Sequence, residues 1–243
     1  LGAGSVAGVA APLGAQLEGP TAVNLIEYPD REMMMIDLAN HLAGELNAAL
    51  HSKGAVSMAV AGGSTPGPMF DDLCAADVAW DHVTIMPSDE RCVPEDHARS
   101  NARMIRSRLM TNRAAAAQFL SFSVAPDADL AGLEAALEPH LPLDLLVLGM
   151  GDDMHTASLF PGAPELEAAL DDHAPAVVRM TPGDGLEPRV TLSGRVLKKA
   201  VSTHVLLTGA NKRKALEAAA TLHDTRLAPI RTVLQQATIH WAE

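Results

Sequence analysis

Short and almost purely apolar runs recur along the chain and end in polar or glycine-rich segments. Their length and composition are typical of strands buried on both faces of a sheet. Helical periodicity fills the intervals, most clearly from about residue 30 to residue 51, where Lys53-Gly54 marks the end. The predicted strands are 22–28, 55–61, 82–86, 119–124, 143–148, 176–180, 189–192, 204–208 and 238–241, and the predicted helices are 30–51, 69–73, 100–109, 127–137, 164–170, 194–200, 211–222 and 226–236.

Strands that alternate with helices in this order predict an α/β fold. We expect a single domain, residues 22–243, with a mostly parallel, Rossmann-like sheet and helices on both faces. Residues 1–21 are rich in Gly, Ala and Pro and match neither a signal peptide nor a helix. We therefore expect them to form a poorly ordered or appended extension.

The formal net charge of -12 excludes a basic surface for nucleic acid and disfavours binding to anionic membranes. Cys74 and Cys92 have neither metal-ligand nor disulfide spacing, which predicts a reducing compartment, the cytoplasm. The two histidines closest in sequence, His41 and His51, are ten positions apart, so no short ligand pair exists and we expect no metal site.

The stretch 143–161 places several reactive side chains directly after a buried strand. Gly149-Met150-Gly151 ends the strand, and Asp152, Asp153, His155, Thr156 and Ser158 follow. Loops at the carboxyl ends of strands are where open α/β sheets bind ligands. The alternative is that both aspartates solvate a turn and cap the next helix. The stretch alone leaves these two interpretations equally balanced.

A second loop of this kind, Gly62-Gly63-Ser64-Thr65-Pro66, joins a strand to a helix. This arrangement points backbone N–H groups at an anion, although the loop lacks the motifs of a nucleotide P-loop or a hydrolase nucleophile elbow. Capping of the next helix by Ser64 or Thr65 is the alternative, and we favour anion binding because consecutive glycines permit close approach.

Charged residues also gather at two other places. Asp89-Glu90-Arg91 follows the strand 82–86, and its residue types alone favour a surface ion-pair cluster. Lys212 and its basic neighbours begin the helix 211–222, where the helix dipole disfavours cations unless an anion offsets them. A solvated basic face is the alternative there.

Four blocks in the right order resemble the 6-phosphogluconolactonase family, part of the wider group that includes glucosamine-6-phosphate isomerase/deaminase. The resemblance spans residues 22–243. The blocks are Ala61 to Pro66; Asp89 to Pro94 with Ser100-Asn101; Gly149 to Pro161; and Arg189 to Leu192 with Gly209 to Lys212.

This resemblance implies hydrolysis of 6-phosphoglucono-1,5-lactone to 6-phosphogluconate without a cofactor or metal, by a monomer or a homodimer. His155 is expected to act as general base, because an imidazole suits that task near neutral pH. Asp153 or Asp89 would orient the imidazole or the water, and Arg91 or the backbone at 149–151 would hold the oxyanion. By resemblance, the substrate phosphate would contact Gly62, Gly63, Ser64, Thr65, Arg189 and Lys212.

One position departs from the family pattern, and three other functions compete with the lactonase. Met154 stands where many members have Gly, so the loop either strains methionine or differs locally. The isomerase relatives carry a carboxylate five residues after the histidine, where this chain has Phe160. A sugar-phosphate sensor would have no use for the base. A dinucleotide-binding oxidoreductase would need a third glycine where Met154 lies.

Overall fold

The computed structural model describes residues 23–183 and 185–243. The predicted extension, 1–21, and the start of the first predicted strand lie outside the described residues. Within the described ranges, no helix combines the length and the apolar composition that crossing a bilayer requires.

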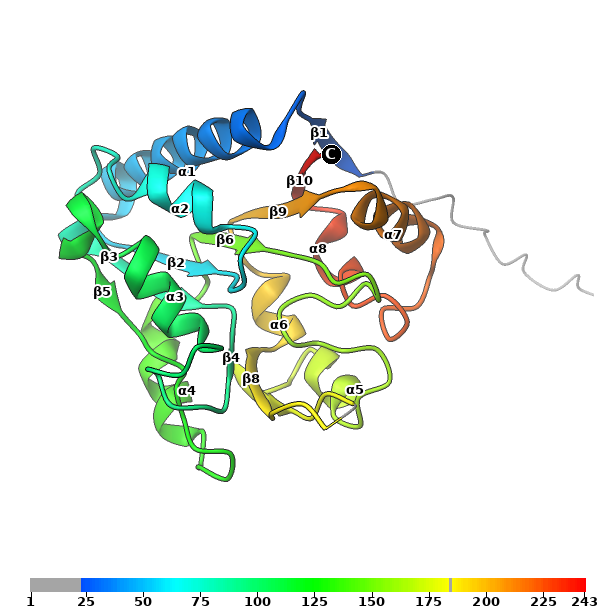
Figure 1. The fold of residues 1–243 in the computed structure, drawn as a ribbon. Coiled ribbons are helices and arrows are strands. Elements are labelled where there is room, and N and C mark those ends of the chain that lie inside the picture. The colour runs from blue at the N-terminus through cyan, green and yellow to red at the C-terminus, as the bar shows by residue number, and fades with distance from the viewer. Residues whose placement is uncertain (1–22, 184) are drawn as a thin grey trace, which may run out of the picture.

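The ten strands of the described residues form two sheets (Figure 1). Seven parallel strands lie in the order β1-β10-β9-β6-β2-β3-β5, which confirms the predicted α/β fold, and three antiparallel strands, β4-β8-β7, form a small second sheet that was not predicted. The strands are β1 Asn24–Glu27, β2 Val56–Val60, β3 Val83–Pro87, β4 Asp89–Arg91, β5 Gln118–Phe119, β6 Leu145–Leu148, β7 Val177–Met180, β8 Arg189–Leu192, β9 Ser202–Thr208 and β10 Thr238–Ala242.

The α-helices follow the predicted order, with shorter ends in several cases. The prediction 226–236 was too long, because Pro229 cannot donate a backbone hydrogen bond and disfavours helical geometry in the residue before it. The helices are α1 Arg31–Lys53, α2 Gly67–Leu73, α3 Asn101–Arg108, α4 Ala131–Leu137, α5 Leu166–Leu170, α6 Gly194–Leu197, α7 Ala210–Thr221 and α8 Arg231–Leu234.

The capping residues of α1 show how local sequence sets a boundary. The Asp30 side chain accepts a hydrogen bond from the Met33 N–H at 2.8 Å, which satisfies one free donor of the first turn. At the other end Gly54 takes a φ of 77° and its N–H donates to the Leu50 carbonyl. That left-handed conformation is the one glycine adopts without strain, so the helix stops where predicted.

The large sheet is buried on both faces and separates two hydrophobic cores. Along β6, Leu146 and Leu148 pack into one core, whereas Leu145 and Val147 pack into the other. This alternation is the period of two that a strand imposes. Helices α1, α2 and α3 cover one face, and α4 to α8 contribute to the core on the other (Figure 1).

The strands β9, β6, β2 and β3 are consecutive and parallel, so their carboxyl ends meet at one edge of the sheet. The segments that follow these strand ends are the glycine-rich loop, the Asp89 triplet in β4, the His155 loop and the start of α7. The fold therefore brings together segments far apart in the sequence, as expected for this class of sheet.

Candidate active site

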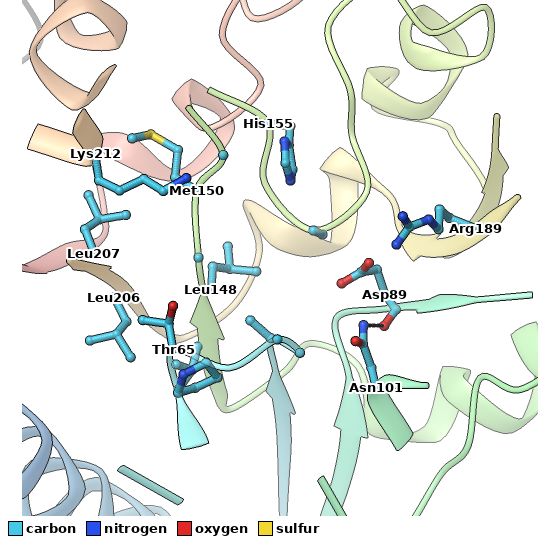
Figure 2. A pocket seen from close by; sticks show the side chains of 18 of the residues that line it. Thr65, Asp89, Asn101, Leu148, Met150, His155, Arg189, Leu206, Leu207 and Lys212 are labelled. Atoms are coloured by element: carbon cyan, nitrogen blue, oxygen red, sulfur yellow. Dashed lines mark hydrogen bonds between the residues drawn. The ribbon is translucent and has the colours of Figure 1, made fainter. Parts of the chain in front are cut away.

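A pocket of about 370 Å³ opens at this edge of the sheet (Figure 2). Its volume is in the range of small-molecule sites. Of the ten predicted site residues, Ser64 lines a neighbouring pocket beside α1 and α2, and Asp153 reaches the pocket through its contact with His155. The other eight line it directly: Gly62, Gly63, Thr65, Asp89, Arg91, His155, Arg189 and Lys212.

Asp153 and His155 are in direct contact through their side chains. His155 Nδ1 lies 2.6 Å from Asp153 Oδ1, and the same oxygen accepts a 3.2 Å hydrogen bond from the His155 backbone N–H. The hydrogen bond from the imidazole is the main reason that the pKa of Asp153 is lowered. An ionised carboxylate only accepts, so in the neutral imidazole Nδ1 carries the proton and Nε2 is the proton acceptor.

The His155 ring is held between a glycine and an aromatic side chain. Phe160 lies 4.6 Å from it, centroid to centroid. A Cβ at Gly151 would lie 2.1 Å from His155 Nδ1 and 2.3 Å from Asp153 Oδ1, so only glycine leaves room for this pair. The pair is therefore fixed by packing as well as by hydrogen bonding.

The loop that carries His155 is strained at two residues. Met154 takes a φ of 67° and Ala157 a φ of 48°, so the first of the two alternatives for Met154 is the correct one. A left-handed conformation of this kind costs roughly 1–2 kcal/mol for a residue with a Cβ. Two backbone hydrogen bonds hold it, from the Met154 N–H to the Gly151 carbonyl and from the Ile230 N–H to the Met154 carbonyl. Strain at a loop with reactive side chains is typical of functional sites.

Asp89 faces the pocket from β4 and is 8% exposed. The hydroxyls of Ser158 and Ser88 donate to its two carboxylate oxygens at 2.6 and 3.2 Å. Its backbone carbonyl accepts a 2.7 Å hydrogen bond from the Asn101 side chain, which occupies the space that a Cβ at Gly62 would need. Asn101 thus links the glycine-rich loop to Asp89.

The expectation of a surface ion-pair cluster at 89–91 is wrong for Glu90. Its side chain is fully buried and has no cation as partner among its hydrogen bonds in the described structure. Its carboxylate accepts from the backbone N–H groups of Arg91, Asn101 and Ala102 and from the Ser100 hydroxyl, at 2.6–3.0 Å. Glu90 therefore satisfies the free donors at the start of α3 and fixes the position of β4.

We expect Glu90→Gln to lower the free energy of unfolding by about 2–4 kcal/mol, because an amide NH₂ would face donors that now meet an oxygen. Urea unfolding monitored by circular dichroism measures this change. Glu95→Gln in the adjoining loop is the matched control, since its half-exposed pair with Arg106 contributes about 1 kcal/mol or less. Equal effects of the two substitutions would contradict the structural role of Glu90.

Two arginines stand side by side on the small sheet. Arg91 on β4 is the register partner of Arg189 on β8, and both line the pocket. Burial, and then the neighbouring Arg91 guanidinium, lowers the pKa of Arg189 below its usual range. Like charges placed directly opposite are unfavourable unless an anion lies between or beside them. Asp89 and Glu187 offset part of this repulsion, and an anionic ligand would offset more of it.

The other side of the pocket carries Lys212, from the first turn of α7. Figure 2 shows Lys212 and Arg189 on opposite sides, with His155 between them. Lys212 Nζ pairs with Asp152 at 3.0 Å, so the two adjacent aspartates have different partners, and neither caps α5, whose N-cap is Glu165. The capping alternative for this loop is wrong.

The glycine-rich loop also lacks the capping role considered for it. The N-cap of α2 is Pro66, and no side chain caps that helix. Gly63 takes a φ of 86°, which turns the chain sharply at the pocket wall. The loop thus leaves backbone donors at the start of α2 without a side-chain acceptor.

Sequence patterns assigned no role to Asn101, Asp152 or Phe160. In the sequence, Asn101 appears only within one of the four family blocks. Phe160 is noted only because the isomerase relatives have a carboxylate at that position. Residue type and spacing do not distinguish Asp152 from Asp153, and only the family resemblance singled out Asp153. Their contacts appear once the loop and α7 are placed in space.

Comparison with solved structures supports this arrangement of the fold. A crystal structure of a 6-phosphogluconolactonase from Shewanella baltica OS155 matches with a TM-score of 0.89 at 31% identity, covering 93% of this chain and 100% of that one. A putative 6-phosphogluconolactonase from Neisseria gonorrhoeae FA 1090 matches with a TM-score of 0.84 at 32% identity, covering 91% and 100%.

Sequence relatives agree with the structural ones. A 6-phosphogluconolactonase from Pseudomonas putida is 36% identical over 236 residues, which cover 93% of this chain and 96% of the relative. One from Rhizobium meliloti (strain 1021) is 38% identical over 216 residues, covering 84% and 92%. A model of the family described as glucosamine-6-phosphate isomerases/6-phosphogluconolactonase matches residues 29–241. The chain therefore belongs to the glucosamine-6-phosphate isomerase/6-phosphogluconolactonase family.

Proposed function

We propose that this chain is a 6-phosphogluconolactonase, a carboxylic ester hydrolase that converts 6-phosphoglucono-1,5-lactone to 6-phosphogluconate in the oxidative pentose phosphate pathway. The relatives described above carry this name. The observation that carries the mechanism is the His155–Asp153 pair at the pocket wall. The pair leaves Nε2 of His155 as a base, and cationic side chains lie on both sides of it (Figure 2). An ester needs no more than an activated water, an oxyanion donor and a leaving-group acid.

His155 acts as the general base. Nε2 takes a proton from water as the water oxygen attacks the lactone carbonyl carbon, and the imidazolium that forms is stabilised by Asp153. When the tetrahedral intermediate collapses, the bond from the carbonyl carbon to the ring oxygen breaks and Nε2–H protonates that oxygen. The ring opens to the hydroxy acid, which ionises and releases one proton to solvent.

Asp89 orients the attacking water, and Arg91 stabilises the oxyanion. Each Asp89 oxygen already accepts one hydroxyl, which leaves capacity to accept from the attacking water or a substrate hydroxyl. Among the backbone donors considered for the oxyanion, the Gly151 N–H is engaged with the His155 carbonyl at 2.9 Å. The remaining donors are the Gly149 and Met150 N–H groups and the Arg91 guanidinium.

The phosphate is held by the cations and the glycine-rich loop. Lys212 and Thr65 approach the ligand from one side and Arg189 approaches from the other, while the backbone of Gly62 and Gly63 also lines the pocket. The reacting molecule carries negative charge at its phosphate and, in the transition state, at its carbonyl oxygen. Cations on both sides of His155 match that distribution.

We expect Lys212→Ala to raise KM by about 10- to 100-fold while kcat changes much less, because one charge-assisted contact to a bound phosphate is lost in both the ground state and the transition state. Steady-state kinetics with the phosphorylated lactone measures both constants. Lys214→Ala is the matched control, since Lys214 is exposed on the same helix and does not line the pocket. An unchanged KM in the Lys212 variant would remove this residue from the phosphate site.

Isomerisation with deamination of glucosamine 6-phosphate is the competing reaction within the family. The position that holds a carboxylate in those relatives is Phe160, whose ring packs on His155 and cannot carry a proton. Turnover of glucosamine 6-phosphate, followed as ammonia release, is expected to be absent. Location in the cytoplasm and a monomeric or homodimeric state stay predictions, tested by fractionation and by sedimentation.

A further inference from the structure

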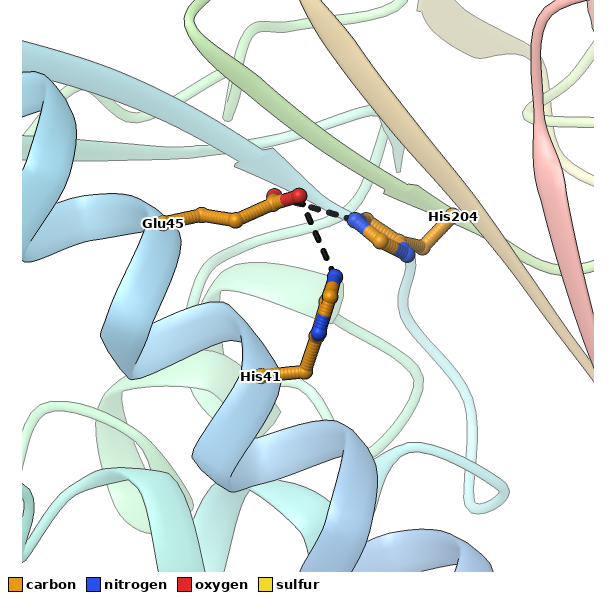
Figure 3. Close-up of side chains that lie close together, drawn as sticks. All are labelled: His41, Glu45 and His204. Carbon is orange, nitrogen blue, oxygen red and sulfur yellow. Dashed lines mark hydrogen bonds and ion pairs between the residues drawn. The ribbon is translucent and has the colours of Figure 1, made fainter.

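A cluster of metal-binding side chains lies between α1 and β9. His41 and Glu45 are four residues apart on one face of α1, and His204 projects from β9 toward them (Figure 3). His41 Nε2 lies 3.2 Å from Glu45 Oε1, and His204 Nε2 lies 3.0 Å from Glu45 Oε2. None of the three lines the pocket described above. The cluster is therefore a separate site.

The spacing of the three ligand atoms suits one metal ion. All lie within 4.8 Å of one another, and ligand atoms around a tetrahedral zinc ion are roughly 3.3 Å apart, given zinc distances of about 2.0–2.2 Å. His204 is 2% exposed in its side chain, whereas His41 is 55% exposed and can rotate to close the remaining gap. The open side leaves room for water as a fourth ligand.

Hydrogen bonds behind His204 fix its ring. Its Nδ1 lies 3.0 Å from His240 Nε2, and His240 Nδ1 lies 2.9 Å from the Tyr28 hydroxyl. That hydroxyl donates its single proton to Asp37 at 2.9 Å, so it accepts from His240 Nδ1. His240 is 2% exposed and its two ring nitrogens contact only Tyr28 and His204 within the described residues. In the neutral ring its Nε2 accepts, and His204 Nδ1 is the donor.

This direction of hydrogen bonding leaves a lone pair on His204 Nε2. That lone pair faces a carboxylate oxygen of Glu45 at 3.0 Å, with the Ser202 hydroxyl 3.1 Å away. The single hydroxyl proton cannot satisfy both acceptors. A metal ion placed between His204 and Glu45 would bind both acceptors at once. A buried imidazole whose second nitrogen is oriented by a hydrogen-bonded chain is the usual setting of a metal ligand.

We propose that His41, Glu45 and His204 bind a divalent transition-metal ion such as Zn²⁺. Two imidazoles and one carboxylate form a common ligand set for zinc. The ion would join α1 to β9 and has no part in the hydrolysis. Histidine spacing along the sequence predicts no metal site, because it does not reveal a His–Glu pair whose third ligand lies on a distant strand.

Titration of chelator-treated protein with Zn²⁺ in an isothermal calorimeter tests this proposal. The native chain is expected to bind one equivalent whose affinity falls by about 10-fold or more in His41→Ala, an exposed substitution that leaves the fold intact. Tyr28→Phe, which breaks the orienting chain behind His204, should also weaken binding. His51→Ala is the matched control, because His51 is exposed on the same helix and outside the cluster.

Thermal melting supplies a second readout, since an ion that binds only the folded chain raises its Tm. Zn²⁺ should raise the Tm of the native chain and of His51→Ala, and much less that of His41→Ala. Equal affinity in the His41 and His51 variants would place the ion elsewhere and overturn the proposal. Absence of Zn²⁺ binding by the native chain would overturn it as well.

Discussion

Replacement of His155 with alanine is expected to lower kcat for lactone hydrolysis by about 10²- to 10⁴-fold, the range that loss of a general base produces. The ring is the only group in the proposed mechanism that both removes the proton of water and returns one to the ring oxygen. Its removal should leave binding nearly intact, because the phosphate contacts come from other segments. KM should therefore change much less than kcat.

Initial rates with freshly prepared lactone, corrected for spontaneous hydrolysis, measure this effect. His173→Ala is the matched control, because that histidine is exposed and does not line the pocket. Both variants should melt near the native temperature, since the His155 side chain is 31% exposed. A His155 variant that retains most of its kcat would assign the base to another residue.

Asp153→Asn is expected to lower kcat by roughly 10²-fold or more without a large change in stability. An amide can donate to Nδ1, which favours the tautomer with the proton on Nε2 and removes the lone pair that accepts from water. The Asp153 side chain is 54% exposed, so replacing it with a neutral residue leaves no buried charge without a partner. The kinetic effect therefore reports on proton position.

Asp152→Asn separates this role from a general effect of charge in the loop. Asp152 is the adjacent carboxylate, but it pairs with Lys212 and not with His155. Its substitution should leave kcat close to the native value and shift only KM. If the two asparagine variants lost kcat to the same extent, the orienting role of Asp153 would be wrong.

Most of the large sheet could be predicted, because its buried strands are short apolar runs such as 143–148. The helices between them show the hydrophobic periodicity of a helix. The small sheet was not predicted. Its strand β4 pairs with β8, about a hundred residues later in the chain, and the local sequence does not indicate such a distant partner. The strands 176–180 and 189–192 were predicted, but their antiparallel pairing as β7 and β8 was not. The predicted helix 226–236 failed at Pro229, which a closer reading of local chemistry would have detected.

The active site, like the fold, could be predicted only in part. The loops that hold Gly63, Asp89 and His155 could be predicted, because each follows a buried strand and parallel strands share one edge. The partner of each side chain could not. Glu90 is a charged residue like its two neighbours in the triplet, but it is fully buried, because backbone donors at the start of α3 replace the water it loses.

Whether the chain hydrolyses the lactone with His155 as its base is tested by the rate at which freshly generated 6-phosphogluconolactone disappears, measured side by side for the native protein, His155→Ala and buffer alone. We predict rapid hydrolysis by the native protein, with one proton released per lactone, and a rate close to that of buffer for the variant. A native rate equal to that of buffer, from folded protein that still binds sugar phosphates, would contradict the lactonase assignment and favour a sensor.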